Sequence, residues 1–196
     1  MLGEDEIILA VPFGGKEYVI GRNPKNSEGL AYMTAVIEYS DWGRVKVSDT
    51  FRHRDYLQLM SEFTDRIQTR TAELQAEQDG KPYALDCFTA KCCIPGSKTA
   101  DYSGQVILID PAALAPEYAT VDNQLCLAKS GNGCKPDGHG TKVYATNIAS
   151  GERYYHRRHE VLGIVRPECI PEWAREKLDE IKRQEQQRNH KEQQER

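Results

Sequence analysis

The sequence predicts an α+β fold, in which antiparallel strands and long helices occupy separate stretches of the chain. Strand-length runs separated by turn residues fill residues 1–50 and 104–165. Between them, over about 52–78, apolar residues recur at three- and four-residue intervals, which is typical of a helix with one buried face. A chain of 196 residues that is 39% hydrophobic can bury one ordinary core or two small ones.

Two hairpins are expected in the first part of the chain. Residues 7–11 form a continuous apolar run, a Pro-Phe-Gly-Gly turn follows, and residues 17–21 alternate as a strand does. Residues 31–39 fit either a strand or a short helix. Their β-branched content, and the Ser-Asp-Trp-Gly turn that separates them from residues 44–47, favour a second hairpin.

The helix expected from about Arg52 to Gln78 should cover one face of this sheet. Three residues can cap its N-terminus, Ser48, Asp49 and Thr50, and Gly80 supplies a C-terminal stop. Its apolar face consists of Leu57, Met60, Phe63, Ile67 and Leu74. The opposite face is charged and is most simply a solvated surface. It also offers three acidic residues as candidate contacts with a basic partner: Glu62, Asp65 and Glu73.

A small antiparallel β module is expected over residues 101–169, after a connector over 81–100 that has little periodicity. Its strand-length runs are 105–109, 124–128, 142–146 and 153–157. The loop over 130–140 contains four glycines, which suggests positive φ angles or a close approach to another part of the protein. The boundary between this module and the sheet-plus-helix unit over 1–80 is therefore expected in the connector.

The chain is expected to end in a helix with a polar tail, over residues 170–196. Pro171 suits the first turn of a helix, and Ala174, Leu178 and Ile181 fall on one face of it. Residues 183–196 include no apolar side chain. That tail is therefore expected either to fray or to form a helix in solvent, where it contributes no core.

Charge and composition exclude some classes of function. The formal net charge of −4 argues against a general nucleic-acid coat protein, which carries a clear basic excess, but it leaves room for a local basic patch. No stretch approaches the roughly 18 consecutive apolar residues of a membrane span, and the acidic start of the chain does not fit a signal peptide. We therefore expect a cytoplasmic protein whose six cysteines are reduced thiols.

Neither a metal site nor a catalytic site is expected. The candidate zinc ligands do not form two tight pairs such as C-x2-C: Cys87, Cys92, Cys93, Cys134, His139, His156 and His159. Cys134 and His139 lie on one flexible loop, and no carboxylate that would orient the histidine can be identified. The Gly-Gly-Lys of residues 14–16 lacks the spacing of a phosphate-binding loop. The sequence thus predicts a protein without a cofactor and without catalytic residues.

Basic and aromatic residues interleave over residues 153–159, Arg-Tyr-Tyr-His-Arg-Arg-His. On a strand, Tyr154, His156 and Arg158 would lie on one face, and the other face would carry Arg153, Tyr155, Arg157 and His159. Such a surface can stack on bases and bind phosphates, or it can contact a protein partner. The alternative is a half-exposed strand whose tyrosines pack inward. The candidate partner-binding residues are Tyr154, Tyr155, Arg157 and Arg158.

Several short segments together resemble small uncharacterised proteins of conjugative elements and phages of anaerobic Firmicutes. These segments are 16–22 (KEYVIGR), 116–120 (PEYAT), 122–125 (DNQL), 131–134 (GNGC), 143–147 (VYATN), 151–152 (GE) and 170–174 (IPEWA). The resemblance implies a setting and gives no catalytic residues. Small acidic proteins of mobile elements often protect the element from host defence, as anti-restriction and anti-CRISPR proteins do.

Two functions are therefore expected. The first is a non-catalytic binding protein, encoded by a mobile element or phage, that inhibits a host defence nuclease by occluding its nucleic-acid or partner site. An acidic surface can compete for the basic channel of such a nuclease. The alternative is a nucleic-acid-binding accessory module that uses the basic and aromatic strand at residues 153–159.

Overall fold

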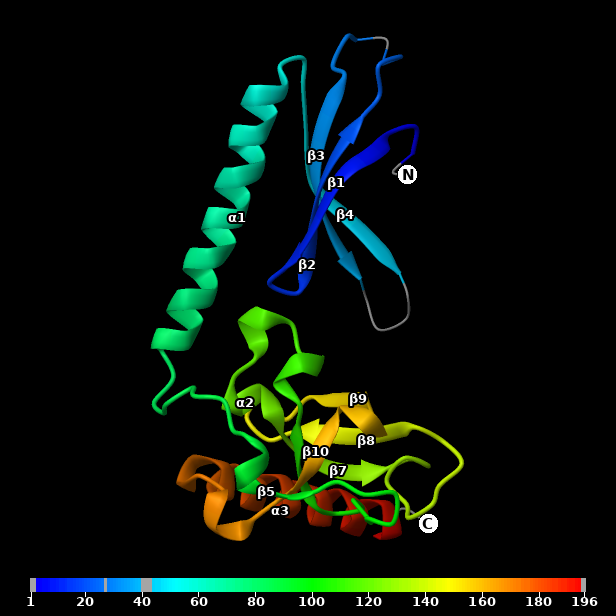
Figure 1. Cartoon of the computed structure of the whole chain (residues 1–196), viewed down its shortest axis with the longest axis vertical. Coiled ribbons are helices and arrows are strands. Elements are labelled where there is room, and N and C mark those ends of the chain that lie inside the picture. Colours follow the sequence, from blue (N-terminus) through cyan, green and yellow to red (C-terminus); the bar gives the residue numbers. More distant parts are fainter. Residues whose placement is uncertain (1–2, 27, 40–43, 195–196) are drawn as a thin grey trace. The chain divides into compact units, whose positions relative to one another are not determined.

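The computed structural model describes residues 3–26, 28–39 and 44–194 (Figure 1). It divides into two compact units, Met1–Lys81 and Pro82–Arg196, which we call unit 1 and unit 2. Within the described residues, unit 1 contains a four-stranded antiparallel sheet and unit 2 a six-stranded antiparallel sheet. Long helices accompany both sheets, so the predicted α+β class is confirmed.

Unit 1 begins with four strands that pair in chain order (Figure 1). They are β1 Glu6–Phe13, β2 Lys16–Arg22, β3 Tyr32–Tyr39 and β4 Val45–His53. Both predicted hairpins are confirmed, and the segment that fitted either a strand or a helix is β3. Gly14 and Gly15 have φ angles of 60° and 76°, so the turn between β1 and β2 requires glycine at both positions. The predicted turn at 40–43 lies outside the described residues.

The predicted start of the long helix is wrong. The three residues that were expected to cap it belong to β4, which pairs with β3 as far as His53. They are Ser48, Asp49 and Thr50. Helix α1 runs over Tyr56–Asp79, and the side chain of Asp55 caps it by accepting a hydrogen bond of 2.8 Å from the backbone N–H of Leu57. The predicted stop is confirmed, because the N–H of Gly80 donates to the carbonyl of Ala76 at 3.1 Å.

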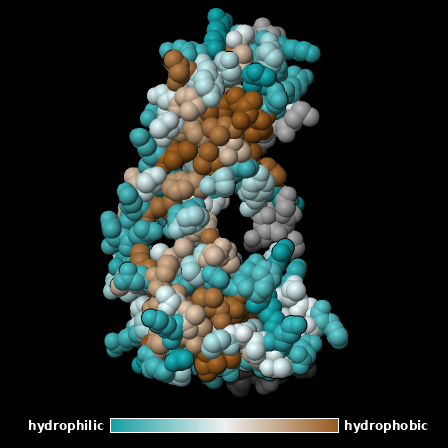
Figure 2. Space-filling model, in the orientation of Figure 1, coloured by the Kyte–Doolittle hydropathy of each residue, from teal (hydrophilic) through white to brown (hydrophobic). Residues whose placement is uncertain are grey.

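Helix α1 packs against one face of the sheet. Leu59 and Phe63 contact Tyr18, Ile20 and Val36 in a buried cluster. Leu57, which was predicted to face the core, is 76% exposed, because the buried stripe of the first turn passes through Leu59. Figure 2 shows hydrophilic side chains along the outer side of α1 and hydrophobic ones gathered over the strands of unit 1.

The other face of this sheet is also buried, although no second helix of the described part of unit 1 covers it. Its cluster consists of Val19, Met33, Ala35 and Ile37. Asp5, next to β1, and Arg52 of β4 form a bidentate ion pair at 2.5 and 2.9 Å, although β1 and β4 are the two edges of the sheet. Since three strand spacings amount to about 14 Å in a flat sheet, the sheet curls over the face away from α1. This curl encloses the second cluster.

Unit 2 is built on a sheet with the strand order β5-β10-β6-β7-β8-β9. Its strands are β5 Cys93–Pro95, β6 Val106–Ile109, β7 Leu125–Ser130, β8 Lys142–Asn147, β9 Arg153–Arg157 and β10 Val161–Val165. Its α-helices are α2 Val121–Gln124 and α3 Glu172–Gln194, and its 3-10 helices are Ala90–Cys92, Pro111–Ala113, Pro116–Tyr118, Arg158–Glu160 and Pro167–Cys169. The four predicted strands are confirmed, whereas β5 and β10 were not predicted.

Each face of the second sheet carries its own core. On one face, Leu108, Leu125 and Leu127 pack against Ala174 and Leu178 of α3, so the predicted apolar side of this helix is confirmed. On the other face, Ile107, Cys126 and Val143 belong to a cluster that includes Tyr102. The segment 81–100, expected as a connector, contributes β5 to this sheet, and α3 extends through the polar tail to Gln194.

Arg158 fixes the loops beside this sheet. Its guanidinium donates to the carbonyls of Ser97 and Ala100 at 2.6 and 2.7 Å and to those of Lys98 and Lys135 at 3.2 and 3.1 Å. It also donates to the carbonyl of Gly133 and lies 4.6 Å from the ring centroid of Tyr102. Arg158 therefore joins the glycine-rich loop to residues 97–100, and its donors are used within unit 2.

The glycine-rich loop approaches backbone closely, as the sequence suggested. A Cβ atom at Gly131, whose φ angle is 107°, would lie 2.3 Å from the carbonyl oxygen of Lys142. One at Gly138 would lie 2.0 Å from the carbonyl oxygen of Asn132. Both distances are shorter than a van der Waals contact, so a larger residue at either position would force the backbone of the loop to move.

We expect the substitution Arg158→Lys to lower the free energy of unfolding by about 2 kcal/mol or more, because an ammonium cannot satisfy carbonyls spread around a planar guanidinium. Urea denaturation followed by circular dichroism measures this change. Arg157→Lys is the matched control, since Arg157 is the exposed neighbour, and it should change stability by less than about 0.5 kcal/mol. Equal effects of the two substitutions would contradict the structural role of Arg158.

Candidate functional site

Five of the seven residues that the sequence singled out lie on two surfaces, one in each unit. The first is the exposed face of the hairpin formed by β8 and β9. In the register of this hairpin, Lys142 is opposite Arg157, Tyr144 is opposite Tyr155, and Thr146 is opposite Arg153. Cross-strand partners point to the same side of a sheet. We call the five residues Lys142, Tyr144, Arg153, Tyr155 and Arg157 the basic-aromatic face.

The side chains of the basic-aromatic face are accessible and lie close to one another. Tyr144 and Tyr155 are 46% and 57% exposed, and their ring centroids are 6.3 Å apart. The ammonium of Lys142 lies 4.7 Å from the ring centroid of Tyr155, a cation–π distance. Strands β8 and β9 contain no acidic residue. The face therefore combines positive charge with flat aromatic surface.

Two of the predicted site residues lie elsewhere. Tyr154 pairs with Ala145, points to the opposite side of β9, and donates from its hydroxyl to the carboxylate of Glu152. Arg158 lies beyond the end of the strand and binds the loop carbonyls described above. Of the four predicted residues of this segment, the structure thus brings together Tyr155 and Arg157. Lys142 and Tyr144 were missed, since the register that places them beside Tyr155 is not visible in the sequence of either strand.

His156 lies on the inner side of the same strand. It pairs with the buried Val143, its Nε2 is 4.0 Å from the sulfur of Cys126, and its Nδ1 is 4.0 Å from the carboxylate of Glu160. Burial lowers the pKa of His156 below its ordinary value, and the nearby Glu160 opposes that shift. The imidazole is therefore neutral at pH 7 and adds no charge to the hairpin.

Among the described residues, β9 forms one edge of the six-stranded sheet. An exposed edge strand can pair with another copy of itself. Antiparallel pairing of two β9 strands about Tyr155 would place Arg153 of one copy opposite Arg157 of the other, and like charges at opposite positions destabilise a sheet. The arginines therefore oppose sheet extension while remaining available to an anionic ligand.

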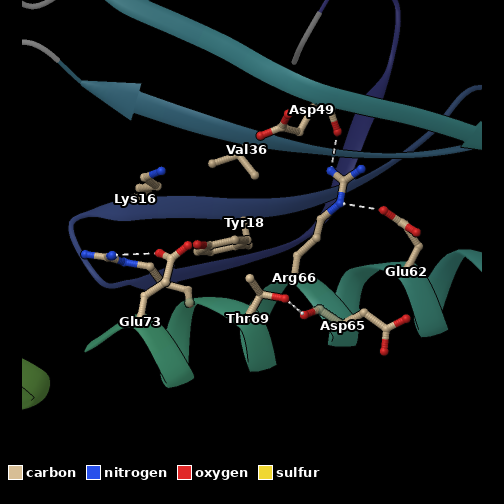
Figure 3. A pocket seen from close by; sticks show the side chains of 10 residues that line it. Lys16, Tyr18, Val36, Asp49, Glu62, Asp65, Arg66, Thr69 and Glu73 are labelled. Atoms are coloured by element: carbon tan, nitrogen blue, oxygen red, sulfur yellow. Dashed lines mark hydrogen bonds and ion pairs between the residues drawn. The ribbon is translucent and has the colours of Figure 1, made fainter. Parts of the chain in front are cut away.

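The second surface is a cleft of about 350 Å³ in unit 1, between α1 and strands β2, β3 and β4 (Figure 3). The three predicted acidic residues of α1 all line it: Glu62, Asp65 and Glu73. The remaining lining residues are Lys16, Tyr18, Val36, Asp49, Arg66, Thr69 and Arg70. We refer to it as the α1 cleft.

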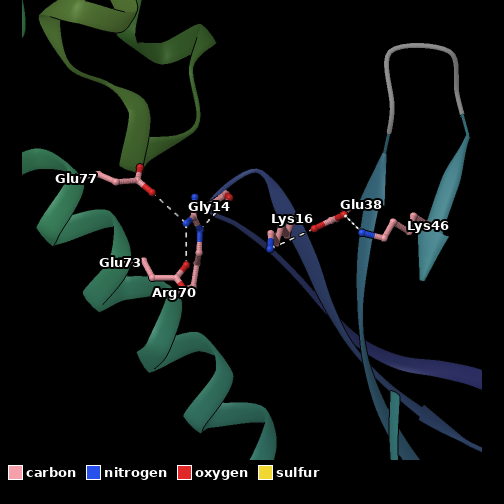
Figure 4. Close-up of polar contacts among 7 residues, drawn as sticks. All are labelled: Gly14, Lys16, Glu38, Lys46, Arg70, Glu73 and Glu77. Carbon is pink, nitrogen blue, oxygen red and sulfur yellow. Dashed lines mark hydrogen bonds and ion pairs between the residues drawn. The ribbon is translucent and has the colours of Figure 1, made fainter. Parts of the chain in front are cut away.

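Two of the three acidic residues are paired with cations of their own helix. Glu62 accepts from Arg66 at 2.9 Å, and Glu73 accepts from Arg70 at 2.9 Å. Arg70 also contacts Glu77 at 3.3 Å and the carbonyl of Gly14 at 3.2 Å (Figure 4). The two arginines offset two of the five negative charges of α1 and leave the helix with a net charge of −3.

Lys16 and Glu38 extend this polar network across the sheet. The ammonium of Lys16 lies 3.2 Å from the carboxylate of Glu38, which also accepts from Lys46 at 3.1 Å (Figure 4). Hydrogen bonds from Lys46 and Lys16 lower the pKa of Glu38. The carboxylate therefore stays ionised well below pH 7.

Tyr18 and Asp49 are two of the seven lining residues that sequence reasoning missed as site residues. Tyr18 is 4% exposed, and burial is the largest cause of its raised pKa, so its phenol is neutral. Asp49 has a φ angle of 50° at the irregularity in the pairing of β3 with β4, and its carbonyl accepts from Arg66. Figure 3 shows both side chains at the cleft together with Val36.

The cysteines and histidines do not assemble into a metal site in the part of the chain that the structure describes. No group of three or more His, Cys, Asp and Glu residues there is arranged to hold a metal ion. Cys134 is buried and donates to the carbonyl of Ser130 at 2.9 Å, whereas His139 is exposed. Across residues 3–26, 28–39 and 44–194, no helix has the length and apolarity needed to cross a membrane.

Comparison with known proteins does not assign the chain to a family. No protein-family model, no curated protein and no solved structure matches the chain. The resemblance to proteins of mobile elements, and the nuclease-inhibitor function expected from it, stay predictions.

The cysteines should differ strongly in reactivity. Burial raises the pKa of Cys126 to about 12, whereas Cys87 is exposed. Because the thiolate is the nucleophile, iodoacetamide at pH 8 should alkylate Cys87 in the native protein and spare Cys126, and both should react in urea. Peptide mass spectrometry measures the two rates. Modification of native Cys126 at the rate of Cys87 would contradict the buried position of β7.

Proposed function

We propose that the chain is a non-catalytic binding protein that holds single-stranded nucleic acid on its basic-aromatic face. The observation that supports this proposal is the arrangement of three cations and two tyrosines on one side of an exposed edge hairpin. Tyrosine rings on a sheet surface stack on bases of any sequence, and the neighbouring cations contact phosphates.

The distribution of charge supports binding at unit 2. Residues 1–81 contain 14 acidic and 10 basic residues, whereas residues 82–196 contain 16 of each. The formal net charge of −4 therefore belongs to unit 1. Locally, the hairpin is positive, because neither of its strands carries a carboxylate. A negative total charge is thus compatible with an anionic ligand at this face.

Single strands fit this face better than a duplex. Bases in a duplex are stacked on one another, so Tyr144 and Tyr155, whose rings are tilted by 60° to each other, have no access to the faces of those bases. An extended single strand can lie along the hairpin with its bases against Tyr144 and Tyr155 and its phosphates near Lys142 and Arg157. Base–aromatic stacking contributes about 1–3 kcal/mol per base, so two rings are sufficient for a measurable preference.

Inhibition of a host nuclease, the function expected from the resemblance, would depend on the acidic residues of α1. Glu62 and Glu73 are already paired with Arg66 and Arg70, so the acidic face is a weaker match for a basic channel than the sequence indicated. Among the described residues, no carboxylate forms an ion pair with Lys142, Arg153 or Arg157 of the basic-aromatic face, and we therefore prefer nucleic-acid binding.

Substitution of the basic-aromatic face should weaken binding in two distinguishable ways. We expect Tyr155→Ala to lower affinity for a fluorescent 12-nucleotide single strand about tenfold, through lost stacking. Arg157→Gln should also lower affinity, and in addition it should reduce the slope of log affinity against log salt by about 0.7, the share of one phosphate contact. Fluorescence anisotropy at several salt concentrations measures both quantities.

Lys91→Gln is the matched control for charge, because Lys91 is exposed in unit 2 and lies outside the basic-aromatic face. It should leave affinity and salt slope unchanged within about twofold. A competing duplex of the same length should displace the strand poorly. If Lys91→Gln acts as strongly as Arg157→Gln, or if the wild-type chain does not bind at low salt, the proposal is wrong.

A further inference from the structure

Two cysteines that are far apart in the chain are in contact in unit 2. The thiol of Cys169 is hydrogen-bonded to the side chain of Cys92, and both residues are free thiols. Both are also only partly buried. The neighbours of Cys169 in the chain, Glu168 and Ile170, line an open depression of about 580 Å³. A small molecule can therefore reach this pair of thiols.

The backbone of Arg166 fixes the positions of both cysteines. Its N–H donates to the carbonyl of Cys92 at 2.9 Å, and its carbonyl accepts from the N–H of Cys169 at 2.9 Å. These bonds continue the pairing of β5 with β10, in which Cys93 is opposite Val165 (Figure 1). The contact between the two thiols is therefore a consequence of the sheet. Thiols in hydrogen-bond contact can form a disulfide with small movements of their side chains.

The other cysteines have different surroundings. Cys93 is fully buried, and its thiol donates to the carbonyl of Ala90 at 3.4 Å. Cys87 is exposed, and its thiol donates to the carbonyl of a residue outside the pair. Cys126 and Cys134 belong to the core cluster of the opposite face of the sheet. None of these four residues takes a place in the contact.

We propose that Cys92 and Cys169 form a reversible disulfide, so that unit 2 has a reduced and an oxidised form. The oxidant is a small disulfide of the glutathione class. One thiolate of the pair attacks it, forms a mixed disulfide and releases one small thiolate. The second protein thiol loses its proton and attacks the protein sulfur of the mixed disulfide, and the other small thiolate leaves. The protein thus gives up two electrons and two protons, and the small disulfide becomes two thiols.

The surroundings of Cys169 set the pH dependence of this exchange. Burial raises the pKa of its thiol, and the hydrogen bond with Cys92 raises that pKa further. The thiolate is the attacking species. Oxidation should therefore be slow at pH 7 and become faster as the pH rises toward 9.

The disulfide would act mainly on the stability of unit 2. It would enclose residues 93–168, which contain all six strands of the sheet. A cross-link across so long a segment removes conformations chiefly from the unfolded chain. The folded hairpin of β8 and β9 stays as it is, so this inference is independent of the nucleic-acid-binding function proposed above.

Oxidised glutathione is the probe that tests the pair. The reduced full chain is incubated with it at pH 8.5, the remaining thiols are alkylated, and the chain is digested without reduction. Mass spectrometry should show one cross-linked species that joins the peptide of Cys92 to the peptide of Cys169. We expect the thermal unfolding midpoint of the oxidised protein to rise by at least about 5 °C. Dithiothreitol should reverse both changes.

Substitutions distinguish an internal disulfide from separate reactions of single thiols. Cys92→Ser and Cys169→Ser should each abolish the cross-link and leave the remaining cysteine of the pair as a stable mixed disulfide with glutathione. Cys87→Ser is the matched control, because Cys87 is the exposed cysteine outside the pair. It should retain both the cross-link and the rise in midpoint. Circular dichroism of each reduced variant verifies that it is folded.

Three results would overturn the proposal. The first is a wild-type chain in which Cys92 and Cys169 stay reduced or carry glutathione without a cross-link. The second is a cross-link that persists in Cys92→Ser, since it would have to use Cys93. The third is a cross-link that forms in urea and not in the native protein. None of these results bears on nucleic-acid binding by the basic-aromatic face.

Discussion

The guanidinium of Arg158 is the interaction on which the arrangement of unit 2 most depends. Five backbone carbonyls from two loops converge on it. The contacts with Gly133 and Ala100 are partly buried, and such carbonyls are costly without donors, so these loops have no equally favourable arrangement in the absence of a planar group with several N–H donors. The same contacts anchor the chain directly after β9. Arg157 and Tyr155 are thereby held on the exposed side of the hairpin. Of the two adjacent arginines, Arg158 stabilises the fold, whereas Arg157 lies at the surface.

Elements whose pattern is local were predictable from the sequence, and elements defined by distant pairing were not. Strand β9 was predicted because its aromatic residues and the turn residues before it mark it within a short window. Strand β5 has three residues and exists because Val165 pairs with Cys93, far away in the chain. The N-terminus of α1 was misplaced for a different reason. Asp49 is a good capping residue by type, and only the pairing of β4 with β3 shows that it lies in a strand irregularity.

The same distinction applies to the two candidate sites. Alternation alone placed Arg153, Tyr155 and Arg157 on one face, because that relationship is geometric and local. The contribution of Lys142 depends on the register between β8 and β9, which no single strand encodes. The α1 cleft was harder to predict, because the residues that line it come from separate elements, among them β2, β4 and α1. The acidic residues of α1 were identified in the sequence by their charge. Tyr18 gave no such signal, because a single tyrosine in an apolar strand is typical of a core position.

The two surfaces differ in charge and in shape, and physical chemistry separates their behaviour. An open face with several cations binds a polymer that releases one counterion for each phosphate neutralised, so its affinity falls steeply as salt rises. The α1 cleft is lined by carboxylates and by cations that already pair with carboxylates, so it offers little net charge to such a polymer. The edge arginines add a further constraint, since they oppose pairing of β9 with a second copy. The basic-aromatic face of unit 2 therefore stays accessible to an extended anion.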